Sequence, residues 1–99
     1  MRKHDSDTRE GAESLAIQAL TYLASEPERM ARFLALTGIG PAEVRHAAAT
    51  SGFLAGVLDH IASDEKLLLA FADEAGIDPA QVGRARRGLA GAHWEREVP

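Results

Sequence analysis

The sequence feature that most constrains this chain is an internal repeat. A shift of 38 positions aligns ten pairs of identical residues, which are apolar core positions, helix stops and helix starts. The pairs are Leu20 and Leu58, Ala24 and Ala62, Ser25 and Ser63, Phe33 and Phe71, Gly38 and Gly76, Ile39 and Ile77, Pro41 and Pro79, Ala42 and Ala80, Val44 and Val82, and Ala47 and Ala85. Such a pattern predicts two copies of one three-helix unit, each too small to bury its apolar face alone. The alternative is that similar residues recur at helix starts and helix stops and produce the identities without a duplication.

Apolar residues recur at helical spacing in six segments, separated by glycine, proline and capping residues. The predicted helices cover about residues 8–24, 27–37, 41–49, 53–62, 65–75 and 79–90. Gly38 and Gly76 are typical of a left-handed glycine at a helix stop, and Asp78 with Pro79 is typical of a helix start. We therefore expect an all-α fold, a compact bundle of about six short helices in two pseudo-repeated three-helix units.

The helix expected at 65–75 carries the densest apolar run. Leu67 to Leu69, Phe71 and Ala72 would lie on more than one side of it. A helix that is apolar on several sides is usually buried. The sequence therefore predicts this helix at the centre of the core.

A length of 99 residues suits one hydrophobic core. We expect a single helical domain over residues 8–90, a disordered N-terminal tail over 1–7 and a flexible C-terminal tail over 91–99. Trp94 is the residue that would anchor the C-terminal tail to the domain.

The composition excludes several classes of function. The chain has no Cys, which removes thiol catalysis, thiolate metal sites and disulfides and fits a reducing compartment. It has no apolar run near the roughly 18 residues that span a bilayer, and its first ten residues are polar. We therefore expect a cytoplasmic protein without a membrane partner. The net charge of -4 disfavours nucleic acid as a partner, although a local basic face would still allow it.

The turn at Gly38–Pro41 is the sharpest candidate for binding chemistry. It resembles the hairpin of helix-hairpin-helix proteins, in which glycines such as Gly38 and Gly40 let backbone amides approach a phosphate at a helix start. Arg45 and His46 follow on the next predicted helix. Glu43 lies in the first turn of that helix, however, and a tight helix connector is the favoured interpretation.

Three arginines form the one basic cluster inside the predicted domain, and they would meet an acidic partner or a nucleic-acid backbone. The preferred interpretation is that these arginines are solvated at the surface, where positive charges toward the end of a helix are favourable. The candidate nucleic-acid contacts are thus Gly38, Gly40, Arg45, His46, Arg84, Arg86 and Arg87.

No set of residues indicates catalysis, a cofactor or a metal. His60 and Asp64 stand four positions apart, but two ligands do not make a metal site. Asp59, His60 and Ser63 invite a comparison with a catalytic triad, yet no glycine-framed nucleophile turn accompanies them. The sequence therefore predicts a protein that is not an enzyme, with no cofactor and no metal.

The leading functional expectation is a non-enzymatic protein-interaction domain. If short helices leave Leu67 to Leu69 partly uncovered, an apolar groove or dimer face remains around the last three helices. An unidentified protein partner or a second copy of the chain would cover it. The alternative function is weak, sequence-independent nucleic-acid binding through the turn at Gly38–Pro41.

Two strings carry a resemblance to a known family. They are Ser-Glu-Pro-Glu-Arg-Met-Ala-Arg-Phe-Leu-Ala-Leu-Thr-Gly at 25–38 and Phe-Leu-Ala-Gly-Val-Leu-Asp-His at 53–60. Together with residues between 64 and 82, they make the chain similar to the short alphaproteobacterial proteins of the domain-of-unknown-function family 3572. The resemblance spans nearly everything between Ala12 and Leu89. It implies a compact helical bacterial protein with no assigned activity, and it supplies no catalytic residues.

Overall fold

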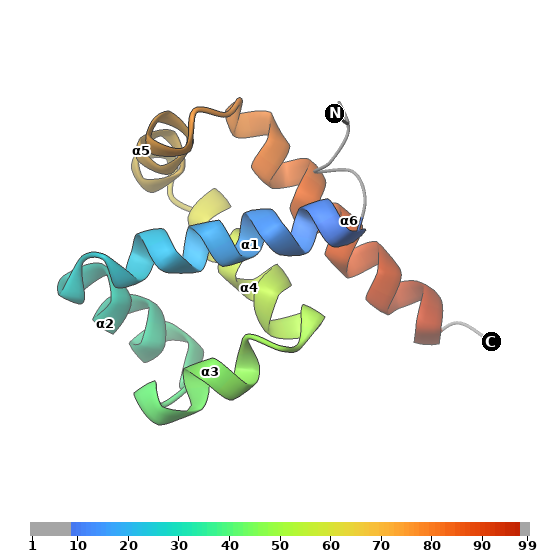
Figure 1. Cartoon of the computed structure of the whole chain (residues 1–99), viewed down its shortest axis with the longest axis horizontal. Helices are drawn as coiled ribbons and strands as arrows, with labels where there is room; N and C mark the ends of the chain where they lie inside the picture. The colour runs from blue at the N-terminus through green and yellow to red at the C-terminus, as the bar shows by residue number, and fades with distance from the viewer. Residues whose placement is uncertain (1–8, 98–99) are drawn as a thin grey trace.

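A computed structural model describes the backbone of residues 9–97 and the side chains of residues 10–89. All the regular structure of this part of the chain is helical, as Figure 1 shows, so the predicted all-α fold is confirmed. The elements are α1 (Arg9–Ala24), α2 (Pro27–Thr37), the 3-10 helix η2 (Pro41–Glu43), α3 (Val44–Ala47), α4 (Ser51–Ala62), α5 (Glu65–Ala75) and α6 (Pro79–Glu97). None of the helices in the described residues is both long and apolar enough to cross a bilayer.

The two predicted glycine stops are confirmed. Gly38 follows α2 with a φ of 77°, and Gly76 follows α5 with a φ of 70°. Only glycine adopts this left-handed conformation without strain. The amide of Gly38 donates to the Leu34 carbonyl at 2.8 Å, and the amide of Ile77 donates to the Ala72 carbonyl at 2.9 Å. These bonds satisfy carbonyls that the helix ends would otherwise leave unpaired.

Side-chain caps fix three helix starts. The Thr50 hydroxyl accepts from the Phe53 amide at the start of α4, and the Asp64 carboxylate accepts from two amides at the start of α5. Asp78 accepts from the Ala80 amide at 2.9 Å, which confirms the predicted cap of α6. Each cap satisfies amides that have no partner inside the helix.

Helix α4, and not α5, lies at the centre of the core. Its buried residues Leu54, Val57, Leu58 and Ile61 pack against α1 on one side and α6 on another. Figure 1 shows α4 crossing behind α1 and beside α6. The remaining buried apolar residues are Ala12, Leu15, Ala16, Ala19 and Leu23 of α1, Val82, Ala85 and Leu89 of α6, Phe33 of α2, and Phe71 and Ala72 of α5.

The prediction that the helix at 65–75 forms the centre of the core is therefore wrong. Helix α5 buries only Phe71 and Ala72, whereas Leu67 and Leu68 are half-buried and Leu69 is 49% exposed. Since α5 packs along one face, Leu67 and Leu68 are covered only in part and Leu69 lies on the exposed side. Leu36 of α2 is likewise 67% exposed.

The two halves of the chain agree in their second helices and differ in their third. Helices α2 and α5 both have 11 residues and end at a left-handed glycine. The single helix predicted over 41–49 is instead η2 followed by the four-residue α3, after which Thr50 is extended and caps α4. Its counterpart α6 has 19 residues. The duplication itself stays a prediction.

The predicted tails lie mostly outside the described residues. Residues 1–7 lie outside the described residues. The backbone of α6 is helical to Glu97, past residue 91, where the C-terminal tail was expected to begin. The side chains of 90–97, including Trp94, lie outside the described side chains, as do residues 98–99.

Two ring contacts join the halves reciprocally. Tyr22 at the end of α1 packs on Phe71 of α5, with ring centroids 5.4 Å apart. His60 at the end of α4 packs on Phe33 of α2 at 5.1 Å. A shift of 38 positions converts Tyr22 into His60 and Phe33 into Phe71. The end of each first helix thus contacts the second helix of the other half.

The position of α4 predicts a large difference between two leucine substitutions. Leu58→Ala leaves a cavity in the buried centre and should lower the free energy of unfolding by about 3 kcal/mol. Leu69→Ala, on the exposed side of α5, should lower it by less than about 1 kcal/mol. Urea denaturation followed by circular dichroism measures both. Equal losses would contradict the assignment of α4 to the centre.

Candidate functional site

The amides of the predicted phosphate-binding turn have acceptors within the chain. The Gly40 amide donates to Glu43 Oε1 at 3.1 Å, and the Ile39 amide donates to the Thr37 hydroxyl at 3.4 Å. A phosphate at this turn would have to displace the Glu43 carboxylate and would be repelled by it. The local geometry favours a helix connector.

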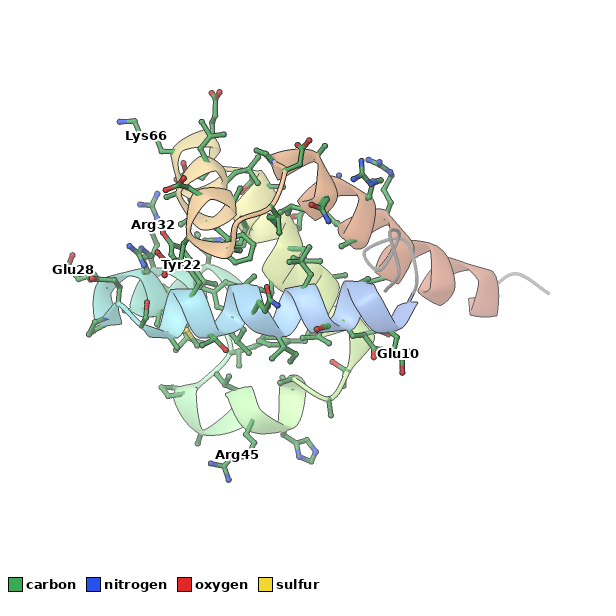
Figure 2. All side chains as sticks on the ribbon, turned by 45° about the horizontal axis from the view of Figure 1, so that its top comes forward. Glu10, Tyr22, Glu28, Arg32, Arg45 and Lys66 are labelled. Carbon is green, nitrogen blue, oxygen red and sulfur yellow. The ribbon has the colours of Figure 1, made fainter. Side chains whose placement is uncertain are left out.

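The basic residues predicted to accompany this turn lie on two separate surfaces. Arg45 and His46 are exposed on α3, where Figure 2 shows Arg45 extending into solvent. The three arginines at 84, 86 and 87 lie on α6, and the ribbons of α6 and α3 lie apart in both Figure 1 and Figure 2. The structure therefore does not bring the seven candidate residues together, and nucleic-acid binding stays an untested prediction.

Arg86 has a structural partner. Its Nη1 lies 3.4 Å from Asp59 Oδ1 on α4, while its Nε is buried and has no hydrogen-bond partner among the described residues. The ion pair links α6 to the central helix. Both side chains are partly exposed, so the pair contributes little to stability.

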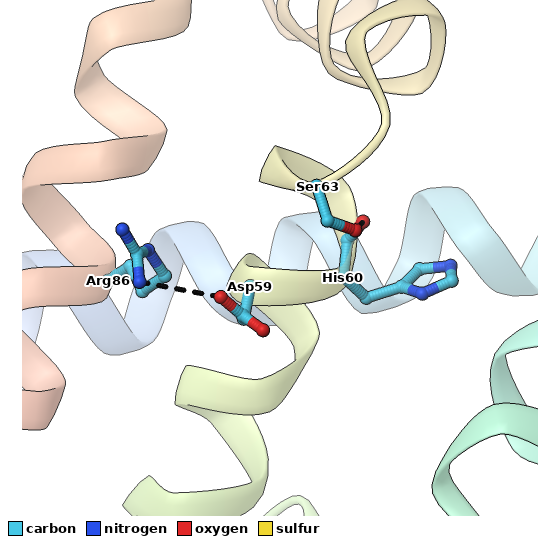
Figure 3. A network of polar contacts seen from close by, with 4 residues as sticks. All are labelled: Asp59, His60, Ser63 and Arg86. Atoms are coloured by element: carbon cyan, nitrogen blue, oxygen red, sulfur yellow. Dashed lines mark hydrogen bonds and ion pairs between the residues drawn. The ribbon is translucent and has the colours of Figure 1, made fainter.

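Asp59, His60 and Ser63 do not form a triad. Figure 3 shows Asp59 turned toward Arg86 and the His60 ring pointing the other way. The Ser63 hydroxyl donates to the backbone carbonyl of His60 at 2.9 Å. Among the described residues, no acid therefore forms a hydrogen bond with the imidazole and no base forms one with the Ser63 hydroxyl, as a nucleophilic triad requires.

A cleft of about 610 Å³ lies between α2 and α5, with the ends of α1 and α4 contributing to its walls. Its lining combines apolar, aromatic, basic and acidic side chains. The residues are Tyr22, Leu23, Arg29, Arg32, Leu36, His60, Ser63, Asp64, Glu65, Lys66, Leu67 and Ala70. The sequence did not predict a site at the basic residues Arg29, Arg32 and Lys66. The lining residues come from four separate helices, so they are not close together in the sequence.

Two of the charged residues in this cleft have defined partners. The Arg29 guanidinium lies over the Tyr22 ring at 4.4 Å and donates to the Tyr22 carbonyl at 3.4 Å. Asp64 Oδ1 accepts from the amides of Lys66 and Leu67. Among the described residues, neither Arg32 nor Lys66 has a hydrogen bond or ion pair through its side chain. The cleft thus contains cations with no partner of their own.

The surroundings of His60 favour the neutral form of its imidazole. Burial lowers the pKa of His60 from 6.5, and the nearby charge of Arg32 lowers it further, although Asp64 and Asp59 oppose the shift. Within the described residues, no group of three or more His, Asp or Glu side chains has a geometry that would hold a metal ion.

A second concavity is an apolar groove of about 370 Å³ between α1 and α5. It is lined by Ile17, Gln18, Thr21, Tyr22, Ser25, Phe71, Glu74 and Ala75. Ile17 is 42% exposed at its edge. The sequence predicts an apolar groove or dimer face if Leu67 to Leu69 are left partly uncovered, and they are. This groove, however, lies along the Phe71–Ala75 part of α5, whereas Leu67 lines the cleft between α2 and α5. The groove was missed because α1 supplies half of its lining.

The lowered pKa of His60 predicts a pH-dependent stability. The unfolded chain binds a proton near pH 6.5, whereas the folded protein resists protonation there. The free energy of unfolding should therefore fall as the pH decreases through about 6.5. His60→Gln should remove this part of the slope in urea denaturations between about pH 8 and 5.5. Parallel profiles for the two proteins would exclude the mechanism.

The hydrogen bond between Glu43 and Gly40 predicts a small, specific loss of stability. Glu43→Ala removes the acceptor of the Gly40 amide and should cost about 0.5–1 kcal/mol. Glu43→Gln retains an acceptor oxygen and serves as the control. Thermal denaturation and hydrogen exchange at the Gly40 amide measure the two effects. Unchanged exchange in Glu43→Ala would show that this hydrogen bond does not protect the amide.

Comparisons with known proteins bear on this architecture. No curated protein and no solved structure matches the chain. One family does match, and its model covers residues 9–92, from the start of α1 into α6. By this match, the chain belongs to the DUF3572 family, described as proteins of unknown function.

Proposed function

We propose that this protein is a non-enzymatic interaction domain whose groove between α1 and α5 binds a basic amphipathic helix of a partner protein. The observation that carries the proposal is the apolar lining of this groove, which remains open to solvent. A groove between two helices accommodates the apolar face of a third helix, with anchors spaced one turn apart. The proposal requires no cofactor.

The residues of the groove suit such a partner. Phe71 and Tyr22 form its aromatic floor, and Ile17 offers an exposed aliphatic edge. Aromatic residues are enriched at the centres of protein interfaces. Covering Ile17 would also remove apolar surface from water, which favours association.

Charge selects a basic partner over an acidic one. Glu74 lies on the rim of the groove, and the chain carries a net charge of -4. A lysine or arginine flanking the apolar anchors would meet Glu74, while an acidic helix would be repelled. The same net charge disfavours a second copy of this chain as the occupant.

The other functional proposals are weaker. Weak nucleic-acid binding through Gly38–Pro41 rests on Arg45 and His46, beside a Gly40 amide that donates a hydrogen bond to Glu43.

We also propose an alphaproteobacterial origin, which rests on the family resemblance, and a cytoplasmic location, which rests on the composition of the chain.

The proposal predicts a specific peptide interaction. A synthetic amphipathic helix of leucine, alanine and lysine should cause saturable amide shifts at Ile17, Tyr22, Phe71 and Glu74 in NMR spectra of the labelled protein. The same peptide with glutamate in place of lysine should bind at least about tenfold more weakly. Shifts confined to other surfaces would contradict the proposal.

Two matched variants separate the groove from general surface hydrophobicity. Ile17→Glu should abolish binding of the lysine peptide. Leu69→Glu changes an apolar residue of similar exposure, 49% against 42%, that does not line the groove, and it should leave binding intact. In the same experiment, a short DNA duplex that shifts Gly38 to His46 in a salt-sensitive manner would favour the nucleic-acid alternative.

A further inference from the structure

We propose that the cleft between α2 and α5 is a second binding site, for a small organic anion in which a phosphate or carboxylate group is joined to an apolar body. This site is independent of the groove between α1 and α5. It uses other residues, apart from Tyr22, which borders both.

The charge of the cleft is opposite in sign to that of the chain. Arg29, Arg32 and Lys66 supply three positive charges, and Asp64 and Glu65 supply two negative ones, which leaves an excess of one positive charge. The whole chain carries -4. Concave surfaces focus such local fields, so an anion is attracted to this cleft in spite of the net charge.

Arg32 is the cation best placed to bind an anion. Arg29 is already held against Tyr22, and Asp64 is engaged with the first turn of α5. Arg32 has no hydrogen bond or ion pair within the described residues, so its guanidinium retains the fork of N–H donors that pairs with carboxylate and phosphate oxygens. Figure 2 shows Tyr22, Arg32 and Lys66 on the same side of the molecule.

His60 adds a polar group that tolerates an anion. Because its pKa is lowered, the His60 imidazole is neutral near pH 7 and both donates and accepts hydrogen bonds. The Ser63 hydroxyl lies in the same lining, but its proton is donated to the His60 carbonyl. The imidazole therefore orients a bound anion without adding net charge.

Part of the opposite wall is apolar. Leu67 and Ala70 of α5 lie there, and a shift of 38 positions places them on Arg29 and Arg32 of α2. The two equivalent helices thus bring basic and apolar side chains to one cleft, which Leu36 of α2 and Glu65 and Lys66 of α5 also line. A ligand that carries an anionic group and an apolar body satisfies both kinds of side chain, and a cleft of about 610 Å³ lies within the range for small-molecule sites.

The test is an NMR titration of the full chain with phenyl phosphate, benzoate, inorganic phosphate and benzyl alcohol. Phenyl phosphate or benzoate should cause saturable shifts at the Arg32 Nε–H and at the amides of residues 63–67, and the tighter of the two identifies the preferred anion. Inorganic phosphate should bind more weakly, because it lacks the apolar body. Benzyl alcohol that binds as tightly as the anions would overturn the proposal, as would the absence of any saturable shift.

Variants assign the effect to the cleft. Arg32→Gln should weaken binding of the preferred anion by at least about tenfold. Because Arg32 is exposed, this variant should fold normally, which circular dichroism checks. Arg45→Gln, an exposed arginine outside the cleft, should leave affinity unchanged. An equal loss of affinity in both variants would show that binding depends only on the overall charge, and it would reject the site. Ile17→Glu should not alter anion binding, so this site and the partner groove fail or succeed separately.

Discussion

The burial of α4 between α1 and α6 is the interaction on which the rest of the structure depends. Leu54, Val57, Leu58 and Ile61 give this helix an apolar surface that more than one neighbour must cover. Helices α1 and α6 supply small and branched residues that fit against it, among them Ala16, Ala19, Val82 and Ala85. Small side chains let the helix axes approach closely, and close packing yields a single well-defined arrangement. A domain of this size has only one such core.

The second helix of each half is attached to this core mainly through one aromatic residue. Phe33 anchors α2 and Phe71 anchors α5, and each contacts the end of the first helix of the other half. Because both helices are anchored along one face, the surfaces beside them are open. The cleft between α2 and α5 and the groove between α1 and α5 are the two results. The arrangement that gives the domain its stability therefore also creates its candidate binding surfaces.

The electrostatics of the chain differ between the global and the local scale. A net charge of -4 argues against anionic ligands when it is read from composition alone. The folded chain nevertheless gathers Arg29, Arg32 and Lys66, with Asp64 and Glu65, around one cleft, while Glu74 lines the groove between α1 and α5. Ligands experience the nearby groups most strongly, because salt screens charges beyond about 10 Å. The two proposed binding surfaces therefore suit partners of opposite charge.

The sequence by itself determined the local structure. It identified the all-α class, the glycine stops at Gly38 and Gly76 and the cap at Asp78, because these features depend on φ preferences and hydrogen bonds within a few residues. It did not determine which helix is central: α5 has the denser leucine run, yet α4 is covered on more sides. It also did not reveal the cleft, since Arg29, Arg32, His60 and Lys66 are ordinary surface residues until α2 and α5 face one another. Periodicity shows that a residue is apolar or charged, whereas only the packing of distant helices decides what covers it and what lies beside it.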